Sequence, residues 1–278
     1  MTRFPKFALL VLIGSFFCIL AGCVLAINSC AKSGQDKPTI SINREIKHFP
    51  ALETVTLPEN LPSQLKEYTG FTVSFNKENH TPNYVVWELL GTEISYDVDR
   101  SDFFWQDTEI EGCPTHRDYS HSGYDRGHIC PAADQKWSEK AMIDCFSMAN
   151  MCPQDHNLNA GAWLTLENKE RQWAVRDSAI VIIAGPIYEG EGQKRIGNSG
   201  VRVPDAFFKA FLAPYIESPR AIAFVYPNMT SPGNMMQYAM SIDDLEEILG
   251  YDLFPSLPDD IENKVESNFS FTEWNRSK

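Results

Sequence analysis

The chain lacks the sequence markers of several common functional classes. It has no G-x-S-x-G segment, the turn that presents the nucleophilic serine of α/β-hydrolases, which disfavours a serine esterase of that kind. It also has no C-x-x-C pair, no internal repeat and no low-complexity tract. The cysteines that follow the N-terminal segment, together with two histidines, lack regular zinc-finger spacing: Cys113, Cys130, Cys145, Cys152, His116 and His128. Structural thiols or disulfides are therefore favoured over a zinc site.

Positive charge is scarce as well. The 278 residues contain 24 Lys and Arg against 37 Asp and Glu, a formal net charge of -13. This balance argues against a protein that coats nucleic acid non-specifically, but it allows a local basic cleft on an acidic body. With 43% hydrophobic residues, the composition is that of an ordinary globular protein of one or two domains.

Charge is absent altogether from residues 7–31, directly after Arg3 and Lys6. This run is longer than the roughly 7–15 apolar residues of a signal-peptide core, and it approaches the ~20 residues that span a bilayer. "LAGC" at 20–23 resembles a bacterial lipoprotein box, and "INSC" at 27–30 is a weaker candidate. We therefore predict a signal or membrane anchor at 1–31 and an exported protein that is membrane-attached, periplasmic or on the cell surface. A lipoprotein, a transmembrane anchor and a cleaved signal all remain open.

The composition changes after this segment. Residues 32–63 contain Ser, Gly, Gln, Pro and scattered charges, which predicts a linker with at most an early strand. Residues 64–278 are predicted to form the folded domain. Export to an oxidising compartment would permit two disulfides among its four cysteines, with three possible pairings that the sequence does not distinguish.

Strand patterns dominate this domain. "FTVSFN" alternates apolar and polar residues, and "IVIIAGPIY" at 180–188 is a continuous apolar run typical of a strand buried on both faces. Three further segments have strand character: 83–90, 205–213 and 221–228. Helices are predicted at 160–177, which is rich in helix-forming residues, and at 241–250, where Ser241 is the expected N-cap.

Residues able to carry out phosphodiester hydrolysis lie in two segments. "SGYDRGHICPAAD" at 122–134 places His128 after Asp-Arg-Gly, and Asn159 stands near the start of the long helix. Glu167 follows eight residues later, a rotation of about 80° at 100° per residue, so both can point from the same side. A histidine base, an oxygen ligand for a hard cation and a carboxylate would converge if the helix packs behind the histidine. Three arginines could bind phosphate: Arg100, Arg126 and Arg171.

Each of these residues also has an ordinary structural interpretation. A lone histidine beside a turn is most often structural, and Asn159 alone would most often cap a helix. Glu167 and Arg171 form an i,i+4 pair of the kind found on exposed helix faces. Composition and spacing alone leave these alternatives open.

Three motifs that follow one another along the chain favour the functional interpretation of these residues over the structural one. "DRGH" at 125–128 is followed by "PAAD", then by N-x-x-P-Q at 150–154 and by N-x-x-x-W-x-x-x-E at 159–167. Together they resemble the DNA/RNA non-specific endonucleases, a family of ββα-metal nucleases. The resemblance extends over about residues 68–263. It implies an α+β fold with a mostly antiparallel central sheet, flanking helices and a ββα-metal finger.

The resemblance also implies roles for individual residues. His128 corresponds to the general base, and Asn159 to the direct protein ligand of Mg²⁺, with Mn²⁺ as a substitute. Glu167 corresponds to the glutamate that orients water around the metal. The remaining catalytic candidates are Asn150, which would hold the geometry of the site, and Arg126, which would support the site or contact phosphate. The last two correspondences are less secure: Arg100 would steady the transition state, and Arg171 would contact substrate phosphate.

The function implied by the resemblance is a metal-dependent endonuclease that cuts DNA and RNA with little sequence specificity. Its partners would be these substrates and, through the N-terminal segment, a membrane; a homodimer is compatible with the family. The rival hypothesis is an exported nucleic-acid-binding or adhesion module on an inactive nuclease fold. The presence of His128, Asn159 and Glu167 together disfavours that rival.

Overall fold

The structure is a computed structural model that describes residues 49–190, 194–230 and 233–276. The predicted signal or anchor at 1–31 lies outside the described residues, as does most of the predicted linker. Within the described ranges, no helix has the length and apolar character needed to cross a membrane.

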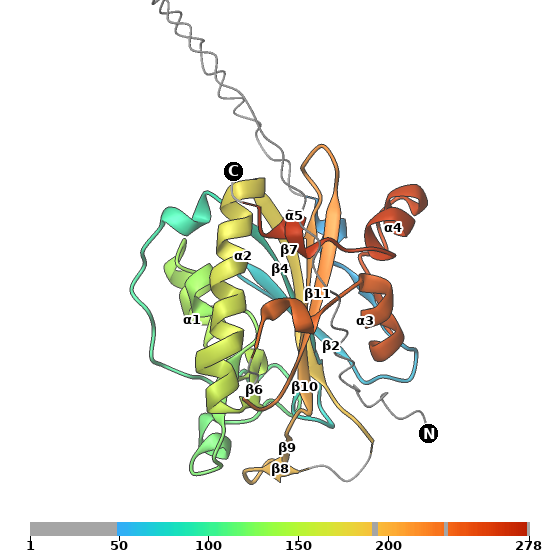
Figure 1. Ribbon diagram of the computed structural model, residues 1–278. Coiled ribbons are helices and arrows are strands. Elements are labelled where there is room, and N and C mark those ends of the chain that lie inside the picture. The colour runs from blue at the N-terminus through green and yellow to red at the C-terminus, as the bar shows by residue number, and fades with distance from the viewer. Residues whose placement is uncertain (1–48, 191–193, 231–232, 277–278) are drawn as a thin grey trace, which may run out of the picture. The chain divides into compact units, whose positions relative to one another are not determined.

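A seven-stranded sheet forms the centre of the domain, in the order β12-β11-β10-β7-β4-β3-β2 (Figure 1). Every neighbouring pair is antiparallel, which confirms the predicted α+β class with its antiparallel sheet. In sheet order the strands are β12 (Ala239–Met240), β11 (Arg220–Pro227), β10 (Ala206–Ala213), β7 (Ala179–Ile187), β4 (Thr81–Leu90), β3 (Phe71–Asn76) and β2 (Gln64–Tyr68). Each of the five predicted strand segments forms one of these strands.

The sheet is buried on both faces because its central strands carry apolar side chains at successive positions. All nine residues of β7 are buried. Successive side chains of a strand point to opposite faces, so Ile182 joins one hydrophobic cluster and Ile183 joins the other. Their cross-strand partners follow the same division, since Trp87 pairs with Ile182 while Val86 pairs with Ile183.

Helices cover both faces (Figure 1). The long helix α2 (Leu164–Asp177) and the short α1 (Glu139–Cys145) lie on one side, and α3 (Ile242–Leu249) and α4 (Asp259–Glu266) on the other. The predicted ends of α3 are confirmed. The Ser241 side chain accepts a hydrogen bond from the Asp244 amide, and Gly250 has the left-handed conformation at φ 68° that ends the helix.

Small elements complete the domain. The two-stranded pairs outside the main sheet are β1 (Val55–Thr56) with β13 (Asp252–Leu253), β5 (Asp125–His128) with β6 (Met151–Gln154), and β8 (Arg195–Ile196) with β9 (Val201–Arg202). A last short helix, α5 (Phe271–Trp274), buries Trp274 against Trp173 of α2, with the ring centroids 4.9 Å apart.

Part of the predicted linker at 32–63 packs onto the domain. Pro50–Glu53 forms a 3-10 helix whose Leu52 is buried in the core, and β1 pairs with β13 near the end of the chain. The carbonyl of Pro62 also accepts a hydrogen bond from the buried Asn83. Within the described residues, packed structure is therefore present from residue 50, because isolated apolar residues in a polar segment have long-range partners that local patterns do not reveal.

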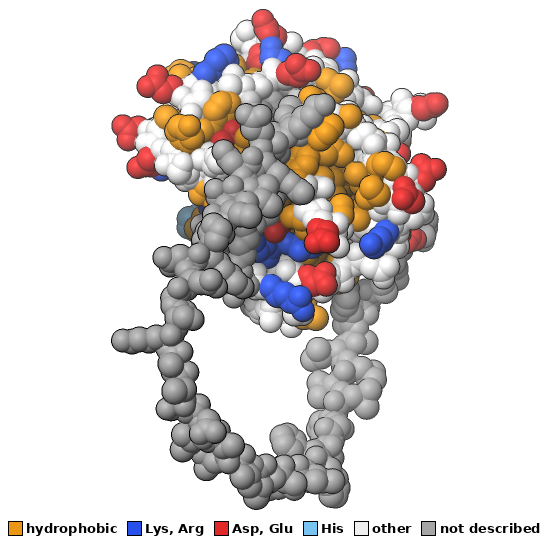
Figure 2. Space-filling view, turned by 90° about the horizontal axis from the view of Figure 1, so that it is seen from above, with side chains coloured by type: hydrophobic (Ala, Val, Ile, Leu, Met, Phe, Trp, Pro, Cys, Tyr) orange, Lys and Arg blue, Asp and Glu red, His pale blue; other side chains and the backbone are white. Residues whose placement is uncertain are grey.

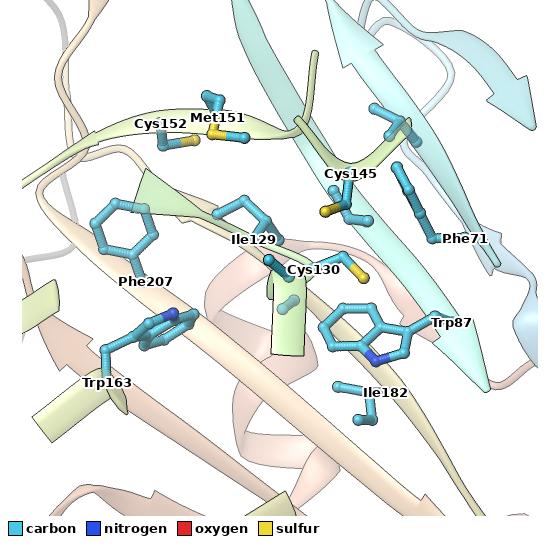
Figure 3. Close-up of a cluster of buried hydrophobic side chains, with 14 of the residues drawn as sticks. Phe71, Trp87, Ile129, Cys130, Cys145, Met151, Cys152, Trp163, Ile182 and Phe207 are labelled. Carbon is cyan, nitrogen blue, oxygen red and sulfur yellow. The ribbon is translucent and has the colours of Figure 1, made fainter. Parts of the chain in front are cut away.

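The four cysteines of the domain are all buried free thiols. Figure 3 shows Cys130 and Cys145 in the core together with Phe71 and Trp87, and Cys152 beside Met151 on β6. Burial raises the pKa of each of the four thiols above its ordinary value. Thiols held protonated in this way are poor nucleophiles and poor metal ligands, so the structure assigns them to packing.

Candidate active site

A β-hairpin and the helix that follows it bring the predicted site residues together. Strands β5 and β6 pair antiparallel, with Gly127 opposite Cys152 and His128 opposite Met151. A Cβ atom at position 127 would lie 2.3 Å from Oε1 of Gln154, so only glycine fits in DRGH at this point. After β6 the chain forms a π-helical turn, Leu158–Trp163, and continues directly into α2.

His128 ends β5 and is held between aromatic rings. Its ring centroid is 4.8 Å from that of Phe146 and 5.7 Å from that of Phe104. Although the residue is only partly buried as a whole, its Nε2 atom is buried and has no hydrogen-bond partner. Loss of solvent and the positive charge of Arg100 lower the pKa of His128 to about 3. The imidazole is therefore neutral near pH 7, the state that a general base requires.

Two of the predicted arginines flank this histidine. The Arg100 guanidinium lies over the Phe146 ring at 5.0 Å from its centroid and is exposed. Arg126 lies over the Phe104 ring at 5.3 Å and donates two hydrogen bonds to the His116 carbonyl. Arg126 is thus anchored to the backbone, whereas Arg100 makes no hydrogen bond or ion pair with any described residue. Of these two guanidinium groups, that of Arg100 is free to meet an incoming anion.

Asn159 lies in the π-helical turn, and its amide is oriented by Asp125 of β5. Its Nδ2 donates to Asp125 Oδ2 at 2.8 Å, and His156 Nδ1 lies 2.9 Å from the same oxygen. Oδ1 of Asn159 accepts no hydrogen bond within the described ranges, so it is available to a ligand. A π turn rotates the chain less per residue than an α turn, because its hydrogen bonds join residues i and i+5. Asn159 therefore lies closer to the face of Glu167 than the predicted 80° offset.

Glu167, in the first turn of α2, is 9% exposed. No hydrogen bond from another described residue reaches its carboxylate. Burial raises the pKa of Glu167 to about 7, and the positive charge of Lys209 is the largest effect that opposes this rise. The carboxylate of Glu167 and the amide oxygen of Asn159 are both oxygen groups of the kind that suits a hard cation and its bound water.

A buried network of charges lies under Glu167. Lys209 Nζ of β10 is 2.9 Å from Glu170 Oε2, and both side chains are fully buried. The same ammonium lies 4.7 Å from the ring centroid of Trp163 and 5.3 Å from that of Trp87. Together these contacts hold the first two turns of α2 against the sheet.

Arg171 lies one turn beyond Glu167 and is part of this network. Its guanidinium donates to Asp134 Oδ1 and to Asn168 Oδ1, each at 2.8 Å. Asp134 also accepts a hydrogen bond from the indole of Trp87. The structure thus joins Arg171 to the core side of the site, and the predicted contact with substrate phosphate remains a prediction.

Asn150 is fully buried between β5 and α1. Its Oδ1 accepts from the Cys130 amide, and its Nδ2 donates to the carbonyls of Cys130 and Cys145, all at 2.9 Å. These three bonds tie the chain after His128 to the end of α1. Asn150 therefore positions the hairpin and has no exposed atom to offer a substrate.

Sequence reasoning missed two residues that shape this site. Asp125 orients the Asn159 amide, and Lys209 supplies the positive charge that most favours the charged form of Glu167. One signal for Lys209 was present, because it is the only charged residue within the apolar run of β10. A lone lysine at a position buried on both sides requires a partner. The partner, Glu170, lies 39 residues away in sequence and could not be identified locally.

The β5–β6 pair, the π turn and helix α2 carry His128, Asn159 and Glu167. The family model described as DNA/RNA non-specific endonuclease matches residues 50–260, and the chain belongs to this family.

Named relatives agree with this assignment. The chain is 32% identical over 234 residues to the mitochondrial nuclease EXOG of Danio rerio, covering 78% of this chain and 66% of that protein. It is 32% identical to the EXOG protein of Homo sapiens, covering 68% of this chain and 56% of that protein. A nuclease of Nostoc is 28% identical over 271 residues, covering 92% of this chain and 96% of that protein. The chain thus spans 56–66% of the length of these two EXOG relatives.

A solved structure shows the same fold. A chain from the crystal structure of the EndoG/EndoGI complex matches with a TM-score of 0.66 and 25% sequence identity. The match covers 71% of this chain and 89% of that chain.

Proposed function

We propose that this protein is a metal-dependent endonuclease that hydrolyses phosphodiester bonds of DNA and RNA with little sequence specificity. The observation that carries the proposal is the neutral imidazole of His128 with an unpartnered Nε2, on the same hairpin-helix unit as Asn159 and Glu167. Its membership of the DNA/RNA non-specific endonuclease family supports the same activity.

In this proposal His128 acts as the general base. Nε2 accepts a proton from the attacking water, because it is an unprotonated nitrogen without a competing donor. Phe104 and Phe146 pack against the ring and fix its orientation. Arg100 sits where it can stabilise the negative charge that develops on the phosphoryl oxygens.

Asn159 Oδ1 would be the direct protein ligand of a hard cation, and the Glu167 carboxylate would orient the water around it; Mg²⁺ is the proposed ion, with Mn²⁺ as a substitute. When bound, such an ion would neutralise charge on the phosphoryl group and on the departing oxygen. Asp125 holds the Asn159 amide so that its oxygen remains free. Lys209 favours the charged form of Glu167 from the opposite side.

Recognition through phosphate explains a broad substrate range, since phosphates carry no direct sequence information. On the face shown in Figure 2, acidic and basic side chains are interspersed around hydrophobic ones. Among the described residues visible there, Lys and Arg side chains form no large patch. In this proposal binding depends on the arginines close to the hairpin, since the overall charge of -13 would repel phosphate.

The substitution Asn159→Ala tests the metal site. Removing the amide oxygen should weaken Mg²⁺ binding, so cleavage of plasmid and RNA should fall at low Mg²⁺ and recover in part as Mg²⁺ is raised. The measurement is the Mg²⁺ concentration that gives half-maximal cleavage. Asn157→Ala is the matched control, because Asn157 is exposed two residues away and its side chain makes no hydrogen bond to another described residue. An unchanged Mg²⁺ requirement in Asn159→Ala would contradict the assignment of the ligand.

The rival function is an exported nucleic-acid-binding or adhesion module on an inactive fold. Incubation of the purified protein with plasmid and RNA, with and without Mg²⁺, distinguishes this rival from the proposed endonuclease. Binding without cleavage at any Mg²⁺ concentration would favour the rival.

We further propose that the protein is exported and attached to a membrane, on the grounds of the charge-free run at 7–31. The full-length protein should be recovered in the membrane fraction of cells, and a variant without residues 1–31 should be recovered in the soluble fraction. Recovery of the full-length chain in the soluble cytoplasm would contradict this proposal.

A further inference from the structure

Three carboxylates converge on the side of the sheet opposite to the candidate active site. Asp243 and Glu246 belong to α3, and Glu266 is the last residue of α4. One carboxylate oxygen of each lies within 4.8 Å of the others. Both helices pack on β11, away from α2 and the β5–β6 hairpin (Figure 1). This cluster is therefore separate from Asn159 and Glu167.

The Glu266 side chain is the evidence that this cluster binds a ligand, because it is buried without a hydrogen-bond partner. It is 4% exposed, and its Oε1 is buried and makes no hydrogen bond. An unpaired carboxylate in such a place costs free energy unless it is protonated or binds a cation.

The other buried acids of the described ranges show how unusual this is. Six of them accept hydrogen bonds from side chains or backbone amides: Asp107, Asp118, Asp134, Asp144, Glu170 and Asp177. The two that accept none are Glu167, at the candidate Mg²⁺ site, and Glu266. Glu266 is thus a buried carboxyl group for which the described residues supply no hydrogen-bond donor.

No basic side chain neutralises the cluster. None of the three carboxylates forms an ion pair with a Lys, Arg or His among the described residues, and Asp252 and Glu262 add further negative charge nearby. Burial, with help from these acids, raises the pKa of Glu266 to about 8 and that of Glu246 to about 7. One oxygen of Glu246 is taken by the Leu253 amide, which leaves the other for a ligand.

We propose that Asp243, Glu246 and Glu266 form a second cation site, which binds a hard divalent ion of the Ca²⁺ class. Ca²⁺ takes oxygen ligands at about 2.3–2.6 Å, so oxygens around one ion lie up to about 5 Å apart, a limit that the three carboxylates meet. Ca²⁺ accepts flexible geometry and completes its shell with water, which suits three ligands at a partly open position. The bound ion would join α3 to α4 and stabilise their packing on the sheet.

The test measures Ca²⁺ binding and thermal unfolding of the full-length chain in the Asn159→Ala background, which removes the proposed active-site ligand. Titration with Ca²⁺ should show one site per chain. At a hundredfold excess over Kd, Ca²⁺ should raise Tm by roughly 5–10 °C. Equal ionic strength from NaCl should not reproduce the shift. Absence of Ca²⁺ binding, or an equal shift with NaCl, would overturn the proposal.

Two variants locate the site. Glu266→Gln should nearly keep Tm without Ca²⁺, because glutamine matches the shape of a carboxyl group that burial holds largely protonated, and it should abolish the Ca²⁺-dependent shift. Asp243 is exposed, so the Asp243→Asn variant should fold normally, and it should lose most of the Ca²⁺-dependent shift. Glu247→Gln is the matched control, since it removes one exposed charge from α3 outside the cluster and should keep the shift. A shift retained in both Glu266→Gln and Asp243→Asn, or lost equally in Glu247→Gln, would refute the site whatever the nuclease activity.

Discussion

His128→Ala should reduce cleavage of both DNA and RNA by at least about 10²–10⁴-fold, the usual contribution of a general base. The melting temperature should change little, because the imidazole makes ring contacts with Phe104 and Phe146 but its Nε2 has no hydrogen bond to lose. Raising Mg²⁺ should not restore activity, since a cation cannot accept the proton of the attacking water. Added imidazole should restore part of it.

The matched control is His116→Ala. His116 is an exposed histidine on the segment that Arg126 contacts, and only its backbone carbonyl takes part in that contact. Its loss should leave cleavage nearly unchanged. If His128→Ala unfolds the domain, the histidine is a core residue. If it leaves both melting and cleavage unchanged, the assignment of the base is wrong.

Lys209→Met should lower the stability of the domain by about 3–5 kcal/mol, the cost of leaving one partner of a buried ion pair alone. For a domain of this size, that corresponds to a fall in Tm of about 6–20 °C. Methionine keeps most of the side-chain volume between Trp87 and Trp163, so the loss would come from the unpaired Glu170 rather than from a cavity. The Mg²⁺ requirement should also rise, because Glu167 loses its largest favourable charge.

A surface pair provides the control for this experiment. Lys77 Nζ lies 2.9 Å from Glu111 Oε2, the same separation as in the Lys209–Glu170 pair, but both side chains are exposed. Lys77→Met should change stability by less than about 1 kcal/mol, because solvent screens the pair. The double variant Lys209→Met with Glu170→Gln should recover part of the lost stability. Equal effects of Lys77→Met and Lys209→Met would show that burial does not govern the contribution of the Lys209 pair.

Much of the fold was readable from local patterns. The continuous apolar run at 180–188 predicted a strand buried on both faces, and all nine residues of β7 are buried. Ser241 and Gly250 marked the ends of α3 because capping depends on residues that are neighbours in sequence. The short strand β1 was missed as a definite element. Its partner β13 lies almost 200 residues further along the chain, and two residues carry too little pattern to predict a pairing.

The candidate site also has features that the sequence predicted and features that only the tertiary structure decided. Sequence motifs identified His128, Asn159 and Glu167 by type and order, since these residues lie in segments whose local spacing is diagnostic. Only the tertiary structure decided their surroundings: the rings that desolvate His128, the Asp125 carboxylate that turns the Asn159 amide, and the Lys209 charge under Glu167. The same holds for the acidic cluster of α3 and α4. Burial, pKa and hydrogen-bond partners depend on segments distant in sequence, so the chain's local patterns determine which residues are present, and its packing determines their chemical state.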